Sequence, residues 1–236
     1  MIYVTSDLHG CSPSVLKQLL KQVDFREEDF LFVLGDVIDR GEFGPELLIW
    51  LSRQRNTRLI LGNHEAWMLA CEFLFEEATV ESLDQLRPEQ RMLLECWLEN
   101  GGGPTIMGLN RLLHQSPDLF DGVMDYVRNA PMYELVNAGG KSYILVHAGL
   151  GNFDPGRDLD DYTPRELLLE RPSLNDRYFT DRVTVFGHTP TEFFGEEFRG
   201  RMLRTDTWWN IDTGVAMGRS PMLLRLEDGQ EFYLEQ

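Results

Sequence analysis

The sequence predicts an α/β fold in which two mixed β-sheets pack face to face as a sandwich, with helices outside. Two observations support this prediction. Apolar strand-like runs alternate with helix-like segments through the first sixty residues, and a second series of strand-like runs begins after about residue 130. An alternation of strands and helices predicts parallel strands joined by right-handed crossovers. The segment between the two series is helical in pattern, and we interpret it as an insertion.

The first sixty residues have the pattern of a βαβαβ unit. The predicted strands lie near Ile2–Thr5, at Phe30–Leu34 and at Thr57–Leu61. The first helix begins at Ser12-Pro13, with serine as the N-cap and proline at the first helical position. The second helix begins near Pro45. Ligands of such sheets bind at the carboxyl ends of the strands, so the polar residues that follow these strands are candidates for a site.

Residues 65 to about 130 change to helical periodicity. Four short amphipathic helices are predicted, at Ala66–Glu77, Glu89–Glu99, Thr105–His114 and Leu119–Arg128. Helices of this kind need another surface on which to bury their apolar faces. We therefore expect residues 1–236 to form one domain with a helical insertion at about 65–130, and not two domains.

Strand-like patterns return in the last hundred residues. The predicted strands are Met132–Val136, Ser142–Val146, Val183–Phe186, Arg201–Thr205, Trp209–Ile211, Met222–Leu226 and Glu231–Leu234. The first two flank a short connection that contains two glycines, which is typical of a hairpin. Thr163 and Glu166 have the spacing of a capping box, which predicts a further helix after them.

Composition narrows the classes of function. The chain has 236 residues and a formal net charge of −17, which argues against binding duplex nucleic acid through phosphate contacts. No segment resembles a signal peptide or approaches the roughly 20 apolar residues of a membrane span. The three cysteines show no CxxC spacing, which predicts reduced thiols and a cytoplasmic protein. The oligomeric state cannot be inferred from the sequence.

Short polar motifs follow several of the predicted strands and contain four of the five histidines. The motifs are Asp7-Leu8-His9-Gly10, Gly35-Asp36 with Asp39-Arg40-Gly41, Gly62-Asn63-His64-Glu65, His147-Ala148-Gly149 and Gly187-His188-Thr189. Histidine, aspartate and asparagine are ligands for divalent metals. Any one motif alone is more typical of a turn or of a satisfied core histidine. Five motifs in this order predict a two-metal phosphoesterase centre.

The first two motifs supply the carboxylates. Asp7 and His9 are two residues apart at a strand end, so backbone geometry can direct both at one ion. Asp36 ends an apolar strand, where a carboxylate is costly to bury unless it meets a cation. Two ions held about 3.5–4 Å apart need a shared anion, and Asp36 is the candidate for that bridge.

The later motifs supply neutral ligands and a candidate acid. Asn63 offers a carbonyl oxygen to a second ion, and His147 and His188 offer imidazoles to the same ion. His64 directly follows Asn63 and is expected to point elsewhere, which suits a general acid. Asp39 is the candidate carboxylate that fixes the tautomer of His64.

Two arginines are expected to bind phosphate oxygens. Arg40 offers a planar fork for them, and a second arginine is expected between the last two motifs. The candidates are Arg157, Arg165, Arg171, Arg177 and Arg182, and spacing alone does not choose among them. Glu65 is explained equally well by a negative charge at a helix N-terminus.

These motifs resemble the calcineurin-like metallophosphoesterase superfamily, specifically the bacterial and phage type of its phosphoprotein phosphatase branch, over roughly residues 2–214. The resemblance implies the four-layer fold of that superfamily. The implied ligands are Asp7, His9 and Asp36 for the first ion, and Asp36, Asn63, His147 and His188 for the second. It also implies that His64 is the acid, Asp39 its partner and Arg40 a phosphate ligand.

The second arginine is also chosen by resemblance. In bacterial and phage members it ends a short helix with an apolar-apolar-x-Arg pattern. Leu168-Leu169-Glu170-Arg171 resembles this ending, so Arg171 is the choice. The family usually has tryptophan where Leu169 stands, and this chain departs from it there.

The implied activity is hydrolysis of phosphomonoesters by a dinuclear metal site, with phosphoserine or phosphothreonine on proteins as the preferred substrate. The acidic surface favours this choice because it would attract basic phosphopeptides. The alternative is a symmetrical diadenosine tetraphosphatase, which the motifs do not separate from it. Mn²⁺ is the first choice of metal, with Fe or Zn²⁺ as alternatives. A non-catalytic metal-binding scaffold would be expected to lack a ligand or the acid, and the sequence lacks neither.

Overall fold

The strands form two mixed sheets, as the sequence predicts, and in the described part of the chain each sheet has five strands. The computed structural model describes residues 1–75 and 86–234. The first sheet has the order β10-β9-β1-β2-β3 and the second β4-β5-β6-β8-β7. The strands of the first sheet are β1 (Ile2–Thr5), β2 (Phe30–Val33), β3 (Thr57–Leu59), β9 (Met222–Arg225) and β10 (Glu231–Tyr233). Those of the second are β4 (Tyr133–Ala138), β5 (Lys141–Val146), β6 (Val183–Phe186), β7 (Leu203–Arg204) and β8 (Trp208–Asn210).

Both sheets have a parallel centre. β1, β2 and β3 run parallel, which confirms the βαβαβ unit, and β5, β6 and β8 run parallel in the second sheet. The hairpin between β4 and β5 is antiparallel, as predicted. The carboxyl ends of the parallel strands of one sheet lie at the same edge, so loops that are distant in sequence meet there.

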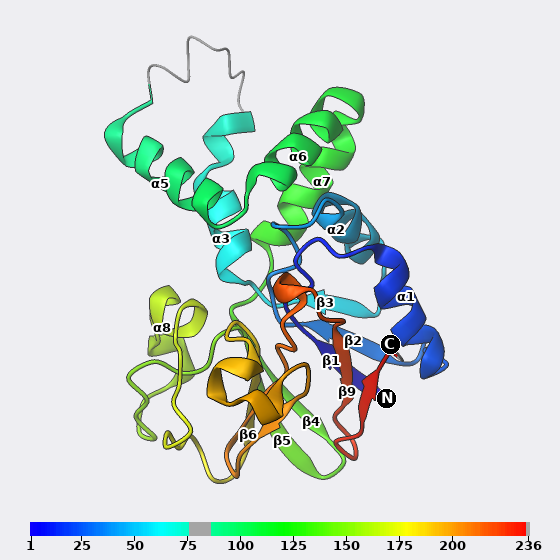
Figure 1. The fold of residues 1–236 in the computed structure, drawn as a ribbon, viewed down its shortest axis with the longest axis vertical. Coiled ribbons are helices and arrows are strands. Elements are labelled where there is room, and N and C mark those ends of the chain that lie inside the picture. The colour runs from blue at the N-terminus through cyan, green and yellow to red at the C-terminus, as the bar shows by residue number, and fades with distance from the viewer. Residues whose placement is uncertain (76–85, 235–236) are drawn as a thin grey trace.

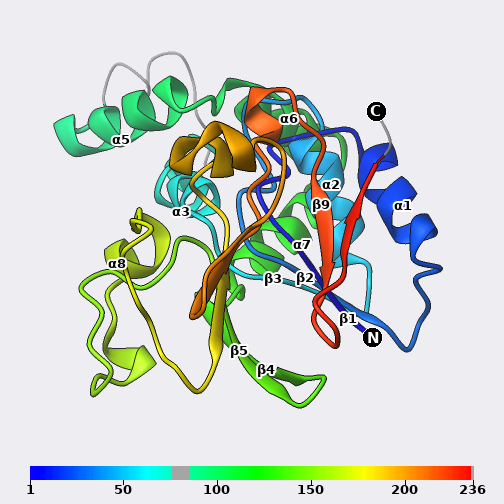
Figure 2. The same cartoon turned by 60° about the horizontal axis from the view of Figure 1, so that its bottom comes forward.

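A shared apolar core joins the two sheets. Val4 and Phe32 of the first sheet pack in one buried cluster with Leu145, Val185 and Trp209 of the second. Side chains from both inner faces therefore fill one layer, as expected for sheets packed face to face. Figure 2 shows β4 and β5 lying beside β1 and β2 in this sandwich.

Two helices cover the outer face of the first sheet (Figure 1). They are α1 (Pro13–Gln22) and α2 (Gly44–Ser52), and both contribute buried leucines to a second apolar cluster. Ser12 is the N-cap of α1 and its hydroxyl accepts a hydrogen bond from the Ser14 N–H at 3.3 Å. The predicted start of this helix is confirmed.

The predicted insertion is helical and extends away from the sheets (Figure 1). Its helices are α3 (Asn63–Ala70), α5 (Pro88–Glu99), α6 (Gly103–Gln115) and α7 (Pro117–Arg128), with a 3₁₀ turn at Glu72–Phe75. The predicted helix Ala66–Glu77 starts three residues too late and continues too far, because α3 begins at Asn63 and ends at Ala70. The last two predicted residues lie outside the described residues. The helix begins earlier because Gly62 is its N-cap and the Glu65 side chain accepts a hydrogen bond from the Gly62 N–H.

The second sheet is covered by α8 (Pro164–Leu168) and by short 3₁₀ turns at Leu159–Asp161, Thr191–Phe194 and Glu196–Phe198. The capping box at the start of α8 is confirmed, because Thr163 and Glu166 exchange side-chain and backbone hydrogen bonds. The predicted strand Arg201–Thr205 is shorter than expected, since only Leu203 and Arg204 pair with β8. A last 3₁₀ turn is Val215–Met217. In the described ranges, no helix combines the length and apolar character needed to cross a membrane.

Candidate metal centre

The polar motifs meet where the parallel strands of both sheets end. The Asp7 N–H donates to the Gly35 carbonyl at 3.1 Å, which links the loops after β1 and β2. The Gly187 N–H donates to the His147 carbonyl at 2.8 Å, which links the loops after β5 and β6. The backbone N–H of His188 donates to both carboxylate oxygens of Asp7 and joins the two pairs of loops.

These loops hold a strained backbone. Eight residues other than glycine have a positive φ in the described ranges, and six of them are predicted site residues: Asp7 (51°), His9 (41°), Asp36 (53°), Asp39 (70°), Arg40 (69°) and His188 (65°). This left-handed region is sparsely populated by residues with a Cβ. Such strain concentrates at functional sites, where the surrounding structure holds it in place.

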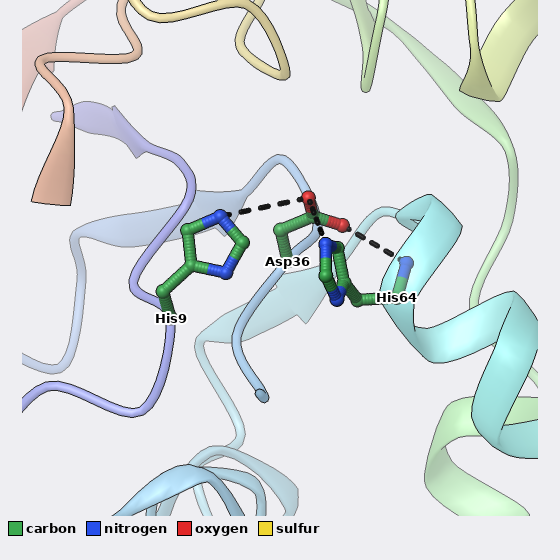
Figure 3. Close-up of side chains that lie close together, drawn as sticks. All are labelled: His9, Asp36 and His64. Carbon is green, nitrogen blue, oxygen red and sulfur yellow. Dashed lines mark hydrogen bonds and ion pairs between the residues drawn. The ribbon is translucent and has the colours of Figure 1, made fainter. Parts of the chain in front are cut away.

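The first group of ligand atoms is formed by His9, Asp36 and His64 (Figure 3). The Nε2 of His9 lies 3.8 Å from the Asp36 carboxylate, and the Nε2 of His64 lies 3.7 Å from the same oxygen. The Nδ1 of His9 donates to the Ile38 carbonyl at 3.3 Å. This bond leaves the Nε2 lone pair of a neutral His9 directed at Asp36.

The second group is formed by Asp36, His147 and His188, so Asp36 belongs to both groups. His147 Nδ1 is 2.7 Å from the Leu34 carbonyl, which can only accept, so Nδ1 carries the proton. The Nε2 of neutral His147 then has a lone pair. It faces the carbonyl oxygen of Asn63 at 2.8 Å and the carboxylate of Asp36 at 3.3 Å. Three electron-pair donors therefore converge without a proton between them.

Burial favours the uncharged form of these side chains. Burial, followed by the nearby carboxylates Asp7 and Glu65, raises the pKa of Asp36 well above its usual value. Burial lowers the pKa of His147 to about 3 and that of His188 to about 2. The imidazoles are thus neutral at neutral pH, which is the form that binds metals. A divalent cation would compensate the buried carboxylates and satisfy the converging lone pairs, so the residues present fit a metal centre.

Asp7 lies at the same edge but differs from the other predicted ligands. It is fully buried, and burial raises its pKa well above the usual value. In this structure its carboxylate accepts from the His188 backbone, and its oxygens belong to neither group of ligand atoms. Its role as a ligand of the first ion stays a prediction.

The predicted acid and its partner form a buried pair. The Nδ1 of His64 lies 2.6 Å from the Asp39 carboxylate, and both side chains are at most 2% exposed. Its Nε2 is on the other side of the ring, beside Asp36. His64 therefore lies closer to the first ligand group than its position after Asn63 suggests.

A small cavity of about 130 Å³ opens over these groups. Its lining residues are Asp36, Arg40, Asn63, His64, Trp67, Asn100, Leu169, Arg171 and His188. Both arginines chosen from the sequence reach it, and Arg171 lies 3.5 Å from the Thr189 hydroxyl. Of the other candidates, Arg157 pairs with Glu166 and Arg182 pairs with Asp181.

Sequence reasoning left the role of Glu65 open and missed two further residues that support the site. The Glu65 carboxylate accepts hydrogen bonds from the backbone N–H groups of Asp36, Val37 and Ile38 at 2.8, 2.8 and 3.3 Å. It therefore clamps the loop after β2, a more specific role than a charge at a helix end. Trp97 and Thr105 contact Asp39 from the insertion, and no local pattern marks them.

The convergence of metal-ligand atoms and arginines on one cavity is the arrangement expected of a metal-dependent phosphoesterase site. Residues 1–225 match the model of the calcineurin-like phosphoesterase family, and the chain belongs to this family. The match confirms the predicted superfamily and the predicted enzyme class, a hydrolase that acts on phosphoester bonds. The calcineurin-like phosphoesterase family is dinuclear metal-dependent, in agreement with the two groups of ligand atoms.

Curated relatives include symmetrical bis(5'-nucleosyl)-tetraphosphatases. The protein of Haemophilus ducreyi is 23% identical over 220 residues, which cover 92% of this chain and 63% of the relative. The protein of Actinobacillus succinogenes is 31% identical over 150 residues, which cover 63% of this chain and 44% of the relative. The chain therefore spans less than two thirds of the length of these relatives.

Solved structures share the fold. One, described provisionally as a diadenosine tetraphosphatase, has a TM-score of 0.65 at 18% identity. The match covers 99% of this chain and 92% of the chain of that structure. A cold-active protein tyrosine phosphatase has a TM-score of 0.54 at 16% identity, and the match covers 100% of this chain and 78% of the phosphatase chain. A metallophosphoesterase from Sphaerobacter thermophilus has a TM-score of 0.50 at 14% identity, and the match covers 99% of this chain and 88% of the metallophosphoesterase chain. The predicted fold class is confirmed.

Proposed function

We propose that this chain is a dinuclear metal-dependent phosphoesterase. The observation that carries the proposal is the convergence of His147 Nε2, the Asn63 carbonyl oxygen and the shared carboxylate of Asp36. Asp7, His9 and Asp36 would hold one ion, and Asp36, Asn63, His147 and His188 the other. When bound, the two ions would supply Lewis-acid activation of the phosphoryl group and of a water molecule.

The remaining roles belong to side chains around the cavity. Arg40 and Arg171 would bind the phosphate oxygens and orient the phosphorus for in-line attack. His64 would donate a proton from Nε2 to the leaving oxygen, with Asp39 holding Nδ1. Mn²⁺ is the proposed metal, with Fe or Zn²⁺ as alternatives, since all three accept histidine, aspartate and asparagine ligands.

For the substrate we favour a dinucleoside tetraphosphate that is cleaved symmetrically. The curated relatives are named as symmetrical bis(5'-nucleosyl)-tetraphosphatases, which supports this choice over a phosphoprotein. So do the two apolar side chains among the cavity residues, Trp67 and Leu169, of which Leu169 is 45% exposed. A nucleoside has a flat apolar base that can pack on such side chains, whereas phosphoserine offers them little.

The second candidate substrate is a phosphomonoester on serine or threonine. One observation favours it: the net charge of −17 would attract basic phosphopeptides and repel a polyanionic dinucleotide. The two cavity arginines oppose this effect locally. The acidic composition alone favours phosphopeptides, and the relatives favour the dinucleotide.

The two substrates are separated by comparing kcat/KM for diadenosine tetraphosphate and for a phosphothreonine peptide, both with Mn²⁺. We expect the dinucleotide to be preferred by at least tenfold and to yield ADP as the only product. A preference for the peptide would overturn the substrate proposal and leave the phosphoesterase proposal intact. Asp36→Asn should abolish both activities, and the exposed Asp118→Asn should change neither. Wild-type turnover by Asp36→Asn would overturn the site itself.

A further inference from the structure

We propose that the helical insertion positions the acid of this site through two residues, Trp97 of α5 and Thr105 of α6. Both hold the carboxylate of Asp39, which in turn holds His64. The inference rests on the proposed role of His64 as the proton donor. Trp97 and Thr105 bond to Asp39 and lie outside the cavity lining, so they are positioning residues.

Three donors fix the Asp39 carboxylate. Its Oδ2 accepts from His64 Nδ1 at 2.6 Å and from Trp97 Nε1 at 2.7 Å. Its Oδ1 accepts from the Thr105 hydroxyl at 2.6 Å, and this hydroxyl also accepts from the Asp39 N–H at 3.0 Å. Asp39, Trp97 and Thr105 are 0% exposed. The carboxylate plane is therefore held by three helices at once, α3, α5 and α6.

The chemistry of the two donors suits this role. An indole N–H and a hydroxyl satisfy lone pairs of a buried carboxylate without neutralising its charge. Lysine or arginine at either position would pair with Asp39 and compete with His64 for its charge. The neutral donors leave that charge available to orient His64, with Nε2 turned towards Asp36 and the cavity.

The turn between α5 and α6 also holds Arg40. The Arg40 N–H donates to the Gly101 carbonyl at 2.9 Å. Gly101 has a φ of +98°, and a Cβ there would lie 2.7 Å from the Arg40 side chain, so this contact requires glycine. The insertion thus contacts both Asp39, the partner of the acid, and Arg40, a proposed phosphate ligand. It therefore helps to position residues of the site.

The inference predicts a dependence on the leaving group. A proton donor matters most when the leaving oxygen is strongly basic, and little when the leaving group is a stable anion. Trp97→Phe and Thr105→Val should therefore lower kcat for phenyl phosphate by about 10–100-fold, within the usual range for an acid. We expect kcat for 2,4-dinitrophenyl phosphate to change by less than about threefold, and KM for both esters by less than about twofold.

Matched variants make the test specific. Thr105→Ser keeps the hydroxyl and should retain wild-type kcat on both esters. Trp50→Phe makes the same change on α2, away from the cavity, and should have no effect. His64→Asn should show the same leaving-group dependence as Trp97→Phe, in a stronger form. If Trp97→Phe fails to fold, the positioning role is tested by Thr105→Val and Thr105→Ser alone: only Thr105→Val should show the leaving-group dependence.

The outcomes separate this inference from the proposed function. Equal losses on both esters, or a change confined to KM, would overturn the positioning role while His64→Asn still shows the leaving-group dependence. If His64→Asn shows no such dependence, the acid assignment is wrong and the inference falls with it. If the wild-type protein with Mn²⁺ hydrolyses neither ester and also fails to hydrolyse diadenosine tetraphosphate, the proposed function itself fails.

Discussion

At the scale of single residues, the site combines strained backbone with buried charge. A left-handed residue in such a loop costs about 1–3 kcal/mol, and six predicted site residues adopt this conformation. Hydrogen bonds that cross between loops offset this cost. The clearest case is Glu65, whose two oxygens accept from four backbone N–H groups, those of Asp36, Val37, Ile38 and Gly62. The loop that carries Asp36 is therefore fixed before any ligand arrives.

Glu65→Gln should destabilise the protein and weaken its metal centre. The amide keeps only one oxygen acceptor and turns an NH₂ group towards backbone N–H donors, which leaves buried donors unsatisfied. We expect the free energy of unfolding to fall by about 2–3 kcal/mol, measured by urea denaturation. Glu134→Gln, on the partly exposed edge strand β4, is the control and should change it by less than about 0.5 kcal/mol. If Glu65→Gln also lowers the free energy of unfolding by less than about 0.5 kcal/mol, Glu65 does not clamp the loop after β2.

At the scale of elements, the sequence predicts what local pattern determines. β1 and β6 match their predicted limits because each is a short run of β-branched and aromatic residues that ends before a serine or a glycine. The start of α3 was missed because its first turn is stabilised by Glu65 and by contacts with a distant loop. Trp97 and Thr105 contact Asp39 across 58 and 66 residues, and neither periodicity nor spacing marks such contacts.

Helix α8, which precedes Arg171, gives a prediction of pH dependence. Hydrogen bonds and the ion pair with Arg157 lower the pKa of Glu166 well below its usual value. A lowered pKa in the folded state means that ionised Glu166 stabilises the protein above about pH 4.5 and that this stabilisation is lost as the pH falls. Glu166→Gln should therefore lower Tm at pH 7 and have a smaller effect at pH 3.5. An equal or larger effect at pH 3.5 would contradict this linkage.

At the scale of the whole molecule, the site depends on both sheets. Asp36 and Asn63 come from the first sheet and the helix after it, whereas His147 and His188 follow strands of the second. The apolar core between the sheets therefore sets the distance between the two halves of the centre. We retain the proposal of one domain with a helical insertion, and the buried cluster that joins β1, β2 and α1 to α5, α6 and α7 supports it.

Two leucines on paired strands test the role of this core. Leu145 of β5 is fully buried between the sheets, and Leu135 of neighbouring β4 is 54% exposed. Leu145→Ala should lower the free energy of unfolding by about 2–5 kcal/mol and also weaken metal binding. Leu135→Ala removes the same atoms from the surface and should cost less than about 0.5 kcal/mol. If the two variants lower the free energy of unfolding equally in denaturant titrations, the core between the sheets does not determine the geometry of the metal centre.

The most direct test of the account is the number of metal ions that the protein binds through Asp36. Isothermal titration with Mn²⁺, with metal content checked by mass spectrometry, should give two ions per wild-type chain. Asp36→Asn removes the shared charge and should weaken binding by more than about 100-fold, while the exposed Asp118→Asn binds as the wild type does. Two tightly bound ions in Asp36→Asn, or fewer than two in the wild-type protein, would contradict the dinuclear centre.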